Sequence, residues 1–288
     1  MNILALITSD LIKQSEMVTN PEGNPVKVIT DKILLKLAHK YSKSPPFMYE
    51  QAMLDGICPY RYLRNRNTLS LEDQLKLARS KIAIIGAGGL GGQSIILLAR
   101  MGIGNLTVVD YDQFDETNLN RQALSSVAAI GEYKALEAQK VVQSINPAVQ
   151  VNPIIQKIGK DNTEMLLTDM DLVIDALDNV PDRLTLEKAA SKVGIPMIHG
   201  ALAGFDGQVS VIRPGKGKLQ ELYGEYSVKK DAPPGPEKIL GVPSVTAAMI
   251  ASFQTMECIK VLLNRGKSDE DQFMHLNLEY TQLNKFSL

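Results

Sequence analysis

The chain has 288 residues, with 31 lysines and arginines against 32 aspartates and glutamates, two cysteines and no tryptophan. A chain of this length and ordinary apolar content can bury a large core without disulfides, which excludes wholesale disorder and a collagen-like repeat. The net charge of −1 provides no basic field for nucleic acid or anionic lipid. The start of the chain lacks the basic leader of an export signal and no apolar run is long enough to span a bilayer, so we expect a cytoplasmic protein.

The N-terminal part of the chain does not share the pattern that follows it. Residues 31–41 have apolar side chains at helical spacing, and Ser70 opens a second helix with a capping-box sequence. Turn-forming residues separate the two helices. We therefore predict an N-terminal extension over residues 1–59, to which the sequence assigns no role, and a main domain over residues 60–288.

From Lys81 onward, short β-branched runs alternate with helical patterns. The expected strands are residues 81–85, 106–110, 149–156, 171–176 and 195–201, and the expected helices are residues 94–101, 133–145 and 183–193. This alternation predicts an α/β fold with a doubly wound, mostly parallel, Rossmann-like sheet.

The pattern changes after Ala201. Residues 207–213 predict a strand without a crossover helix, and residues 214–241 predict a long loop rich in glycine, proline and lysine. A loop of that length in a compact domain is usually a functional lid or a disordered segment. An amphipathic helix over residues 245–263 and a hairpin over residues 273–288 complete a C-terminal antiparallel addition.

A glycine-rich segment follows the first strand of the main domain. Its five glycines are Gly86, Gly88, Gly89, Gly91 and Gly92. Gly86, Gly88 and Gly91 have the spacing G-x-G-x-x-G between a strand and a helix, where backbone N–H groups and the helix N-terminus can hold phosphate. Asp110 ends the next strand, where a carboxylate can accept a hydrogen bond from ribose. The motif alone allows a dinucleotide or ATP, and the bland alternative is a tight turn packed for its own sake.

Two cations follow this motif near the carboxyl edge of the predicted sheet. Arg121 comes shortly after Asn118, and Lys134 lies on the next predicted helix. Together they suit a triphosphate better than the neutralised pyrophosphate of a nicotinamide cofactor. Lys134 considered alone would be an ordinary solvated side chain on a helix face.

Another acidic position follows the strand that ends near Asp175. Asp178 lies just beyond this strand, where a carboxylate would point into a ligand crevice and could bind Mg²⁺ beside phosphate. The alternative is that Asp178 caps the helix that begins near Pro181, although Asn179 and Asp182 lie nearer to that helix start.

These motifs together resemble those of the MoeB/ThiF/HesA family, the bacterial relatives of ubiquitin-activating enzymes. The resemblance covers roughly residues 60–265 and rests on the order and spacing of the glycine segment, Asp110-x-Asp112, Asn118-Leu-Asn-Arg-Gln122, Lys134, Asp175-x-x-Asp178-Asn179 and Arg61-Tyr-x-Arg64. It implies an adenylyltransferase, or nucleotidyltransferase. Such an enzyme uses ATP and Mg²⁺ to adenylylate the C-terminal Gly-Gly carboxylate of a small ubiquitin-like sulfur carrier protein, and it releases pyrophosphate.

The resemblance also implies a role for individual residues. Asp178 matches the Mg²⁺ ligand, and Arg64 matches an arginine finger that reaches the ATP of the other subunit, which implies a homodimer. The implied nucleotide contacts, beside the glycines, are Asp110 at the ribose, Asn118, Arg121 and Lys134 at the triphosphate, and Asp112 and Gln122 in the same site. Arg64, Arg121, Lys134 and Asp178 are the implied catalytic residues. A basic surface segment is the alternative interpretation of Arg64 and its neighbours.

The proposed chemistry needs no general base. A C-terminal carboxylate has a pKa of about 3.5 and is already ionised at neutral pH. The barrier is then mainly repulsion between two anions and their alignment, which cations and a rigid glycine loop can lower. The lack of a catalytic histidine motif is therefore expected, and we expect His199 to pack or bond locally.

The cysteines separate this sequence from many members of the family. It has no Cys-x-x-Cys pair, so we predict no zinc site, and residues 216–241 contain no cysteine for a covalent second step with the carrier. Cys58 and Cys258 are expected to be structural, although the sequence leaves a reactive role open for Cys58.

Other functions remain open at this stage. The same site could activate another carboxylate, such as that of a peptide or a modified tRNA base. The glycine segment with Asp110 alone would also suit an NAD-dependent oxidoreductase, and a non-catalytic carrier-binding scaffold would retain a similar fold. The sequence does not name the carrier or its pathway.

Overall fold

The structure is a computed structural model that describes residues 2–20, 22–223, 236–266 and 272–287. The strands of its main sheet are β4 (Lys81–Ile85), β5 (Asn105–Val109), β6 (Gln150–Ile154), β7 (Leu172–Asp175), β8 (Met197–Ala203), β9 (Asp206–Ile212), β10 (Gln272–Asn277) and β11 (Gln282–Ser287). They lie in the order β11-β10-β9-β8-β7-β4-β5-β6. All pairs from β8 to β6 in this order are parallel, whereas β9, β10 and β11 are antiparallel additions. The predicted fold class is confirmed.

Helices cover both faces of this sheet. They are α4 (Leu71–Arg79), α5 (Gly89–Met101), α6 (Lys134–Ile145), α7 (Thr163–Leu167), α8 (Val180–Val193), α9 (Lys218–Tyr223), α10 (Pro236–Leu240) and α11 (Ser244–Leu263), with short 3₁₀ helices η1 (Tyr60–Asn65), η2 (Glu116–Asn118) and η3 (Val127–Ala129). The predicted capping box is present, because the Ser70 and Asp73 side chains each accept from the other's backbone N–H.

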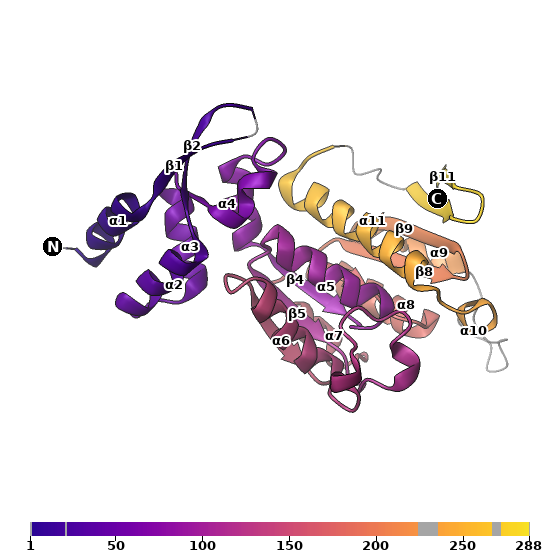
Figure 1. The fold of residues 1–288 in the computed structure, drawn as a ribbon. Helices are drawn as coiled ribbons and strands as arrows, with labels where there is room; N and C mark the ends of the chain where they lie inside the picture. The colour runs from indigo at the N-terminus through magenta and orange to yellow at the C-terminus, as the bar shows by residue number, and fades with distance from the viewer. Residues whose placement is uncertain (1, 21, 224–235, 267–271, 288) are drawn as a thin grey trace.

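The alternation of side chains along β4 shows how the two layers form. Ile82 and Ile84 join the core under α5, α6 and α11, while Ala83 and Ile85 join a second core under α7, α8 and α9. Successive side chains of a strand point to opposite faces, so a strand that is apolar at every position must be covered on both sides. Figure 1 shows α11 running alongside α5 across one face.

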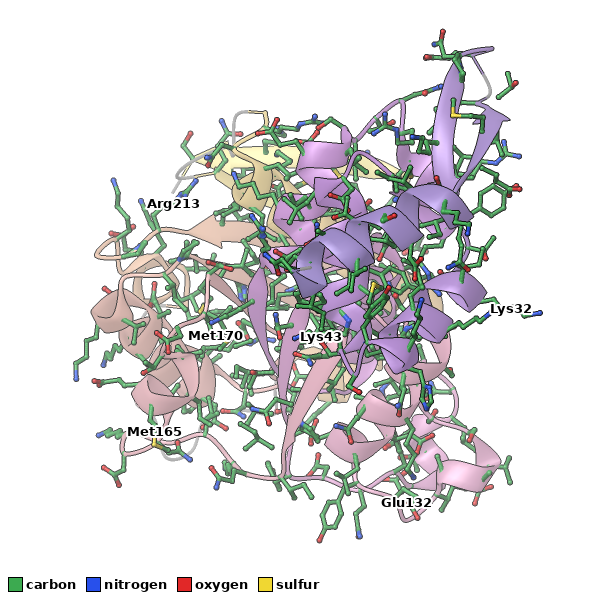
Figure 2. The ribbon with its side chains drawn as sticks, turned by 90° about the vertical axis from the view of Figure 1, so that its left-hand side faces the viewer. Lys32, Lys43, Glu132, Met165, Met170 and Arg213 are labelled. Atoms are coloured by element: carbon green, nitrogen blue, oxygen red, sulfur yellow. The ribbon has the colours of Figure 1, made fainter. Side chains whose placement is uncertain are left out.

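The N-terminal region has its own small core, which the sequence did not predict in this detail. Its elements are α1 (Ile3–Gln14), β1 (Glu16–Thr19), β2 (Pro25–Ile29), α2 (Asp31–Lys40), α3 (Pro45–Leu54) and β3 (Cys58–Pro59). The three strands pair in the order β1-β2-β3, and the helices pack with them around buried residues such as Leu11, Leu34 and Met48. This region projects from one end of the molecule in Figure 1. Lys32 on α2 points away from the main sheet into solvent (Figure 2).

The two long segments of the C-terminal part are the predicted loop over residues 214–241 and helix α11. Residues 214–241 do not form one long loop, because α9 and α10 lie within them, while residues 224–235 of the predicted loop are outside the described residues. Helix α11 is long and apolar enough to cross a membrane by length and composition. It instead lies against α5, β8 and β9, and residues such as Ile250 and Cys258 on it are fully buried in the core.

Candidate functional site

The glycine segment forms a tight turn between β4 and α5. Gly86 has a positive φ of 97°, and a Cβ there would lie 2.6 Å from the carbonyl oxygen of Ala176, just beyond β7. A Cβ on Gly91 would lie only 1.8 Å from the carbonyl oxygen of Gly86. Gly88 is the N-cap of α5 and supplies no side-chain cap, which leaves N–H groups of the first turn available to an anion. Close backbone packing therefore explains Gly86 and Gly91, while Gly88 leaves space in front of the helix.

Asp110 holds this turn to the end of β5. Its Oδ2 accepts a hydrogen bond from the Ala87 N–H at 2.7 Å, and its Oδ1 accepts from the Asp112 N–H at 2.8 Å. Burial raises the pKa of the Asp110 carboxyl, against the lowering effect of these two backbone donors. The carboxylate thus has a structural role in the loop, and each oxygen keeps a further lone pair for a ligand.

Lys134 is buried in an unusual place for a cation. It is the first residue of α6, where the positive end of the helix dipole disfavours another positive charge. Its side chain is only 8% exposed, and its Nζ lies 3.1 Å from the Asp112 carboxylate, which is 48% exposed. Among the described residues Asp112 is the carboxylate in direct contact with this ammonium, while Asp110 and Asp115 lie within electrostatic range without a contact. The arrangement is typical of a site that receives an additional anion.

The segment after η2 lies directly against the glycine turn. A Cβ built on Gly89 would be 3.8 Å from Cγ of Arg121, and one on Gly88 would be 3.7 Å from Nε2 of Gln122. The Gln122 Oε1 is buried and has no hydrogen-bond partner among the described residues. The Asn118 side chain is already used locally, since its Nδ2 donates to Asp115 within a capping box around η2. The structure therefore brings the Arg121 stem and the Gln122 amide to the glycine turn. Arg121 Nη1 donates to the Thr117 carbonyl oxygen at 2.8 Å and to Asn120 Oδ1 at 2.9 Å, and the Asn118 side chain is committed to the loop itself.

Asp178 is exposed beside the same turn. Asn179, and not Asp178, caps α8, because its side chain accepts from the Asp182 N–H at 2.9 Å. The capping alternative for Asp178 is therefore wrong, and its Oδ1 only accepts from the neighbouring Asn179 amide at 3.2 Å. Within the described ranges, no three His, Cys, Asp or Glu side chains gather in a metal-binding group. A cation at Asp178 would need most of its ligands from phosphate and water, as Mg²⁺ commonly does.

Comparisons with known proteins identify the family of this chain. Residues 62–288 match the family model described as the ThiF family. The chain belongs to the ThiF family. A sulfur carrier protein adenylyltransferase of Thermus thermophilus is 37% identical to this ThiF-family chain, over 68% of the chain and 74% of the relative. The SAMP-activating enzyme E1 of Haloferax volcanii is 34% identical, over 75% of the chain and 80% of the relative.

Solved structures show the same fold at lower identity. The E. coli MccB structure with MccA-N7isoASN superposes with a TM-score of 0.66 and 19% identity, and covers 79% of this ThiF-family chain and 71% of MccB. The structure of PaaA superposes with a TM-score of 0.66 and 18% identity, over 94% of this chain and 99% of PaaA. The PaaA likeness extends beyond residues 62–288, which make up 227 of the 288 residues. The N-terminal region is thus part of a shared fold.

In this ThiF-family chain, Arg64 lies far from the glycine turn. It is exposed on η1, and η1 packs at the amino end of the main sheet, where the Tyr62 hydroxyl accepts from Asn146 at 2.9 Å. The ring of Tyr62 lies against Gly102, just before β5. The glycine turn is at the carboxyl end, and a five-residue strand spans about 17 Å. Arg64 therefore does not join the other candidate residues within one chain.

A buried polar network lies behind Asp178, and the sequence did not predict it. Asp175 and His199 are fully buried and joined at 2.7 Å, and Arg183 and Tyr223 complete the group. The sequence places Asp175 in a motif and predicts only local packing or bonding for His199. No sequence pattern indicates a role for Arg183 or Tyr223. The hydrogen bonds of His199 to Asp175 and of Tyr223 to Arg183 and His199 join residues 24 to 40 positions apart, so no local pattern could pair them.

Proposed function

We propose that this chain is an ATP- and Mg²⁺-dependent adenylyltransferase that activates the C-terminal Gly-Gly carboxylate of a small ubiquitin-like sulfur carrier protein and releases pyrophosphate. The observation that carries the proposal is Lys134, a buried cation at a helix N-terminus that contacts the half-exposed Asp112 carboxylate. The names of the relatives from T. thermophilus and H. volcanii support the class of substrate. They also favour nucleotide transfer over an oxidoreductase or a non-catalytic scaffold.

The residues present fit ATP. The uncapped start of α5 offers N–H donors, and Gln122 has a buried oxygen without a partner among the described residues. The Arg121 stem lies against the same turn, and Lys134 contacts Asp112, whose N–H donates to the turn-holding Asp110. Asp178 supplies one exposed carboxylate at the neighbouring turn. A single carboxylate suits a hard cation that takes most of its ligands from phosphate. When bound there, Mg²⁺ would neutralise part of the charge on the phosphate oxygens.

The chemistry then follows from charge and alignment. A carboxylate oxygen of the carrier forms a bond to the α-phosphorus of ATP, the bond from that phosphorus to the bridging oxygen breaks, and pyrophosphate leaves with its electron pair. Lys134 and Arg121 lower the repulsion between the two anions, and the glycine turn fixes the phosphates. Asp110 keeps the turn in place through the Ala87 N–H. No side chain has to remove a proton.

The test compares two lysines on the same helix. Lys134→Met should lower ATP–pyrophosphate exchange, measured with a carrier protein ending in Gly-Gly, by roughly 100-fold or more, because a buried charge contact to phosphate is lost. Lys140→Met is the matched control, since the Lys140 side chain is 58% exposed and pairs with Glu132 and Glu137 on the same part of the surface. Asp178→Ala should abolish the Mg²⁺-dependent part of the exchange. Equal exchange in all variants would contradict the proposal.

Several finer assignments stay proposals. We propose a homodimer in which Arg64 of one subunit reaches the ATP of the other, since η1 lies at the wrong end of the sheet to serve its own site. We propose residues 1–59 as an N-terminal extension of an adenylyltransferase domain over residues 60–288, and a cytoplasmic location for the whole protein.

A second candidate substrate is the carboxylate of a peptide without a folded carrier. The N-terminal region supports it, because β1 pairs with β2 on one side only, and an extended peptide can add to such an edge. The two substrates are separated by comparing exchange with a whole carrier protein and with a synthetic peptide of its C-terminal sequence. If the peptide alone gives the same kcat/KM, recognition of a folded carrier is refuted.

A further inference from the structure

Four side chains from four elements form a polar network beneath the turn that presents Asp178, and Arg183 Nε is buried in it without a hydrogen-bond partner among the described residues. His199 Nδ1 lies 2.7 Å from Asp175 Oδ2, and the Tyr223 hydroxyl lies 3.1 Å from His199 Nε2. Arg183 Nη1 donates to the same hydroxyl at 2.6 Å, and its Nε lies 3.8 Å from Asp175 Oδ2. The network therefore joins the ends of β7 and β8 to helices α8 and α9.

An assignment of hydrogens with a neutral His199 satisfies these contacts. The Tyr223 hydroxyl accepts from Arg183 and from the Gln208 amide at 2.8 Å, so its own hydrogen is free to point to His199 Nε2. His199 then carries its hydrogen on Nδ1 and donates it to Asp175. Burial lowers the pKa of His199 despite the Asp175 carboxylate, which agrees with a neutral ring. The single buried ion pair is thus Asp175 with Arg183.

The network holds both backbone polar groups of Leu177, the residue before Asp178. Asp175 Oδ1 accepts from the Leu177 N–H at 3.0 Å, and Arg183 Nη2 donates to the Leu177 carbonyl oxygen at 2.6 Å. Leu177 lies between Ala176, which contacts the Gly86 turn, and Asp178. A buried ion pair rarely adds net stability over apolar packing, so its use at this turn points to positioning.

We propose that Asp175, Arg183, His199 and Tyr223 are positioning residues that set the orientation of the Leu177–Asp178 turn for a divalent cation and link it to helix α9. The inference deepens the proposed function, because it names the device that places the proposed metal ligand. Its shared point is the Tyr223 hydroxyl, which touches Arg183 and His199 together. Removing that one oxygen should loosen the turn without changing any residue that contacts substrate.

The experiment measures ATP affinity of the full chain by calorimetry over a range of Mg²⁺ concentrations. Tyr223→Phe should raise the Mg²⁺ concentration for half-maximal enhancement of ATP binding by about tenfold, since outer partners of metal ligands typically contribute 10–100-fold. Affinity without Mg²⁺ should stay within about twofold of the unsubstituted chain. Tyr49→Phe is the matched control, because the buried Tyr49 loses a comparable hydroxyl bond to Asp31 in the N-terminal region. Arg183→Lys keeps the positive charge but removes the planar guanidinium that donates to two partners. It should therefore also raise the Mg²⁺ concentration for half-maximal enhancement of ATP binding.

A double-mutant comparison decides whether the network acts through the metal ligand. In an Asp178→Ala background, Tyr223→Phe should cause no further change in Mg²⁺ dependence. An additive effect, or an unchanged Mg²⁺ requirement in Tyr223→Phe alone, would overturn the inference. Because calorimetry needs no carrier, failure of carrier-dependent exchange in the unsubstituted chain would reject the proposed function and leave this result interpretable. ATP binding that never responds to Mg²⁺ would reject the inference itself.

Discussion

Replacing Gly91 by alanine tests whether the glycine turn depends on close backbone packing. The added Cβ would lie 1.8 Å from the Gly86 carbonyl oxygen, whereas ordinary contacts begin at 3.4 Å, so α5 and the turn must separate by up to 1.6 Å. Overpacked sites typically cost about 1–3 kcal/mol. Because both the helix and the Gly86 carbonyl are backbone, no side-chain rotation relieves this clash, and we expect about 3 kcal/mol.

Gly89→Ala on the same helix is the matched control. Its Cβ would meet nothing closer than 3.7 Å, and alanine is favoured over glycine in a helix by roughly 0.5–1 kcal/mol. Thermal unfolding followed by circular dichroism should show a Tm about 6–12 °C lower for Gly91→Ala, at about 2–4 °C per kcal/mol. Gly89→Ala should melt at or slightly above the unsubstituted chain. If the two variants melt within about 2 °C of each other, the packing argument is refuted.

Three further predictions follow from the contacts described above. Burial lowers the pKa of His199, so the unfolded chain takes up a proton that the folded chain resists as the pH falls below about 6.5. The free energy of unfolding should therefore decrease by up to about 1.4 kcal/mol per pH unit in that range. Urea titrations of His199→Gln should lack this slope. Burial raises the pKa of Cys58 to about 11 and raises that of the fully buried Cys258, so neither thiol should react with Ellman's reagent before unfolding; rapid labelling of the folded chain would contradict this. If Arg64 acts across a dimer, mixing inactive Arg64→Ala and Asp178→Ala chains after subunit exchange should restore about a quarter of the sites, whereas no recovery would place Arg64 outside the partner's site.

Much of the fold was predictable because its signals are local. The β-branched run of β4, the glycine spacing and the start of α5 are contiguous, and each restricts the backbone by itself. The same holds for the capping box at Ser70, which the structure confirms. The N-terminal helices are harder to predict, because two prolines after a helical pattern favour its end, whereas Pro45 also begins α3. Nor does a sequence show that α9 and α10 interrupt residues 214–241.

For the candidate site, the sequence by itself placed Asp110, Lys134 and the glycines at one edge of the sheet, since the carboxyl ends of parallel strands meet there. Only the tertiary structure decided which side chains are already used and which remain available. It assigned Asn118 to a local capping box and left Asp178 exposed. It also put Arg64 at the opposite end of the sheet and assembled the network around Tyr223.

The physical reason is the range over which each signal acts. Hydrophobic periodicity and backbone restriction depend on neighbours within a few residues, and they specify strands, helices and turns. Hydrogen-bond partners of buried polar groups are chosen by packing between elements, as with His199 and Asp175 across 24 residues. The sequence alone therefore determined where a nucleotide site could form, and the packing of β7, β8, α8 and α9 determined how its acidic turn is held.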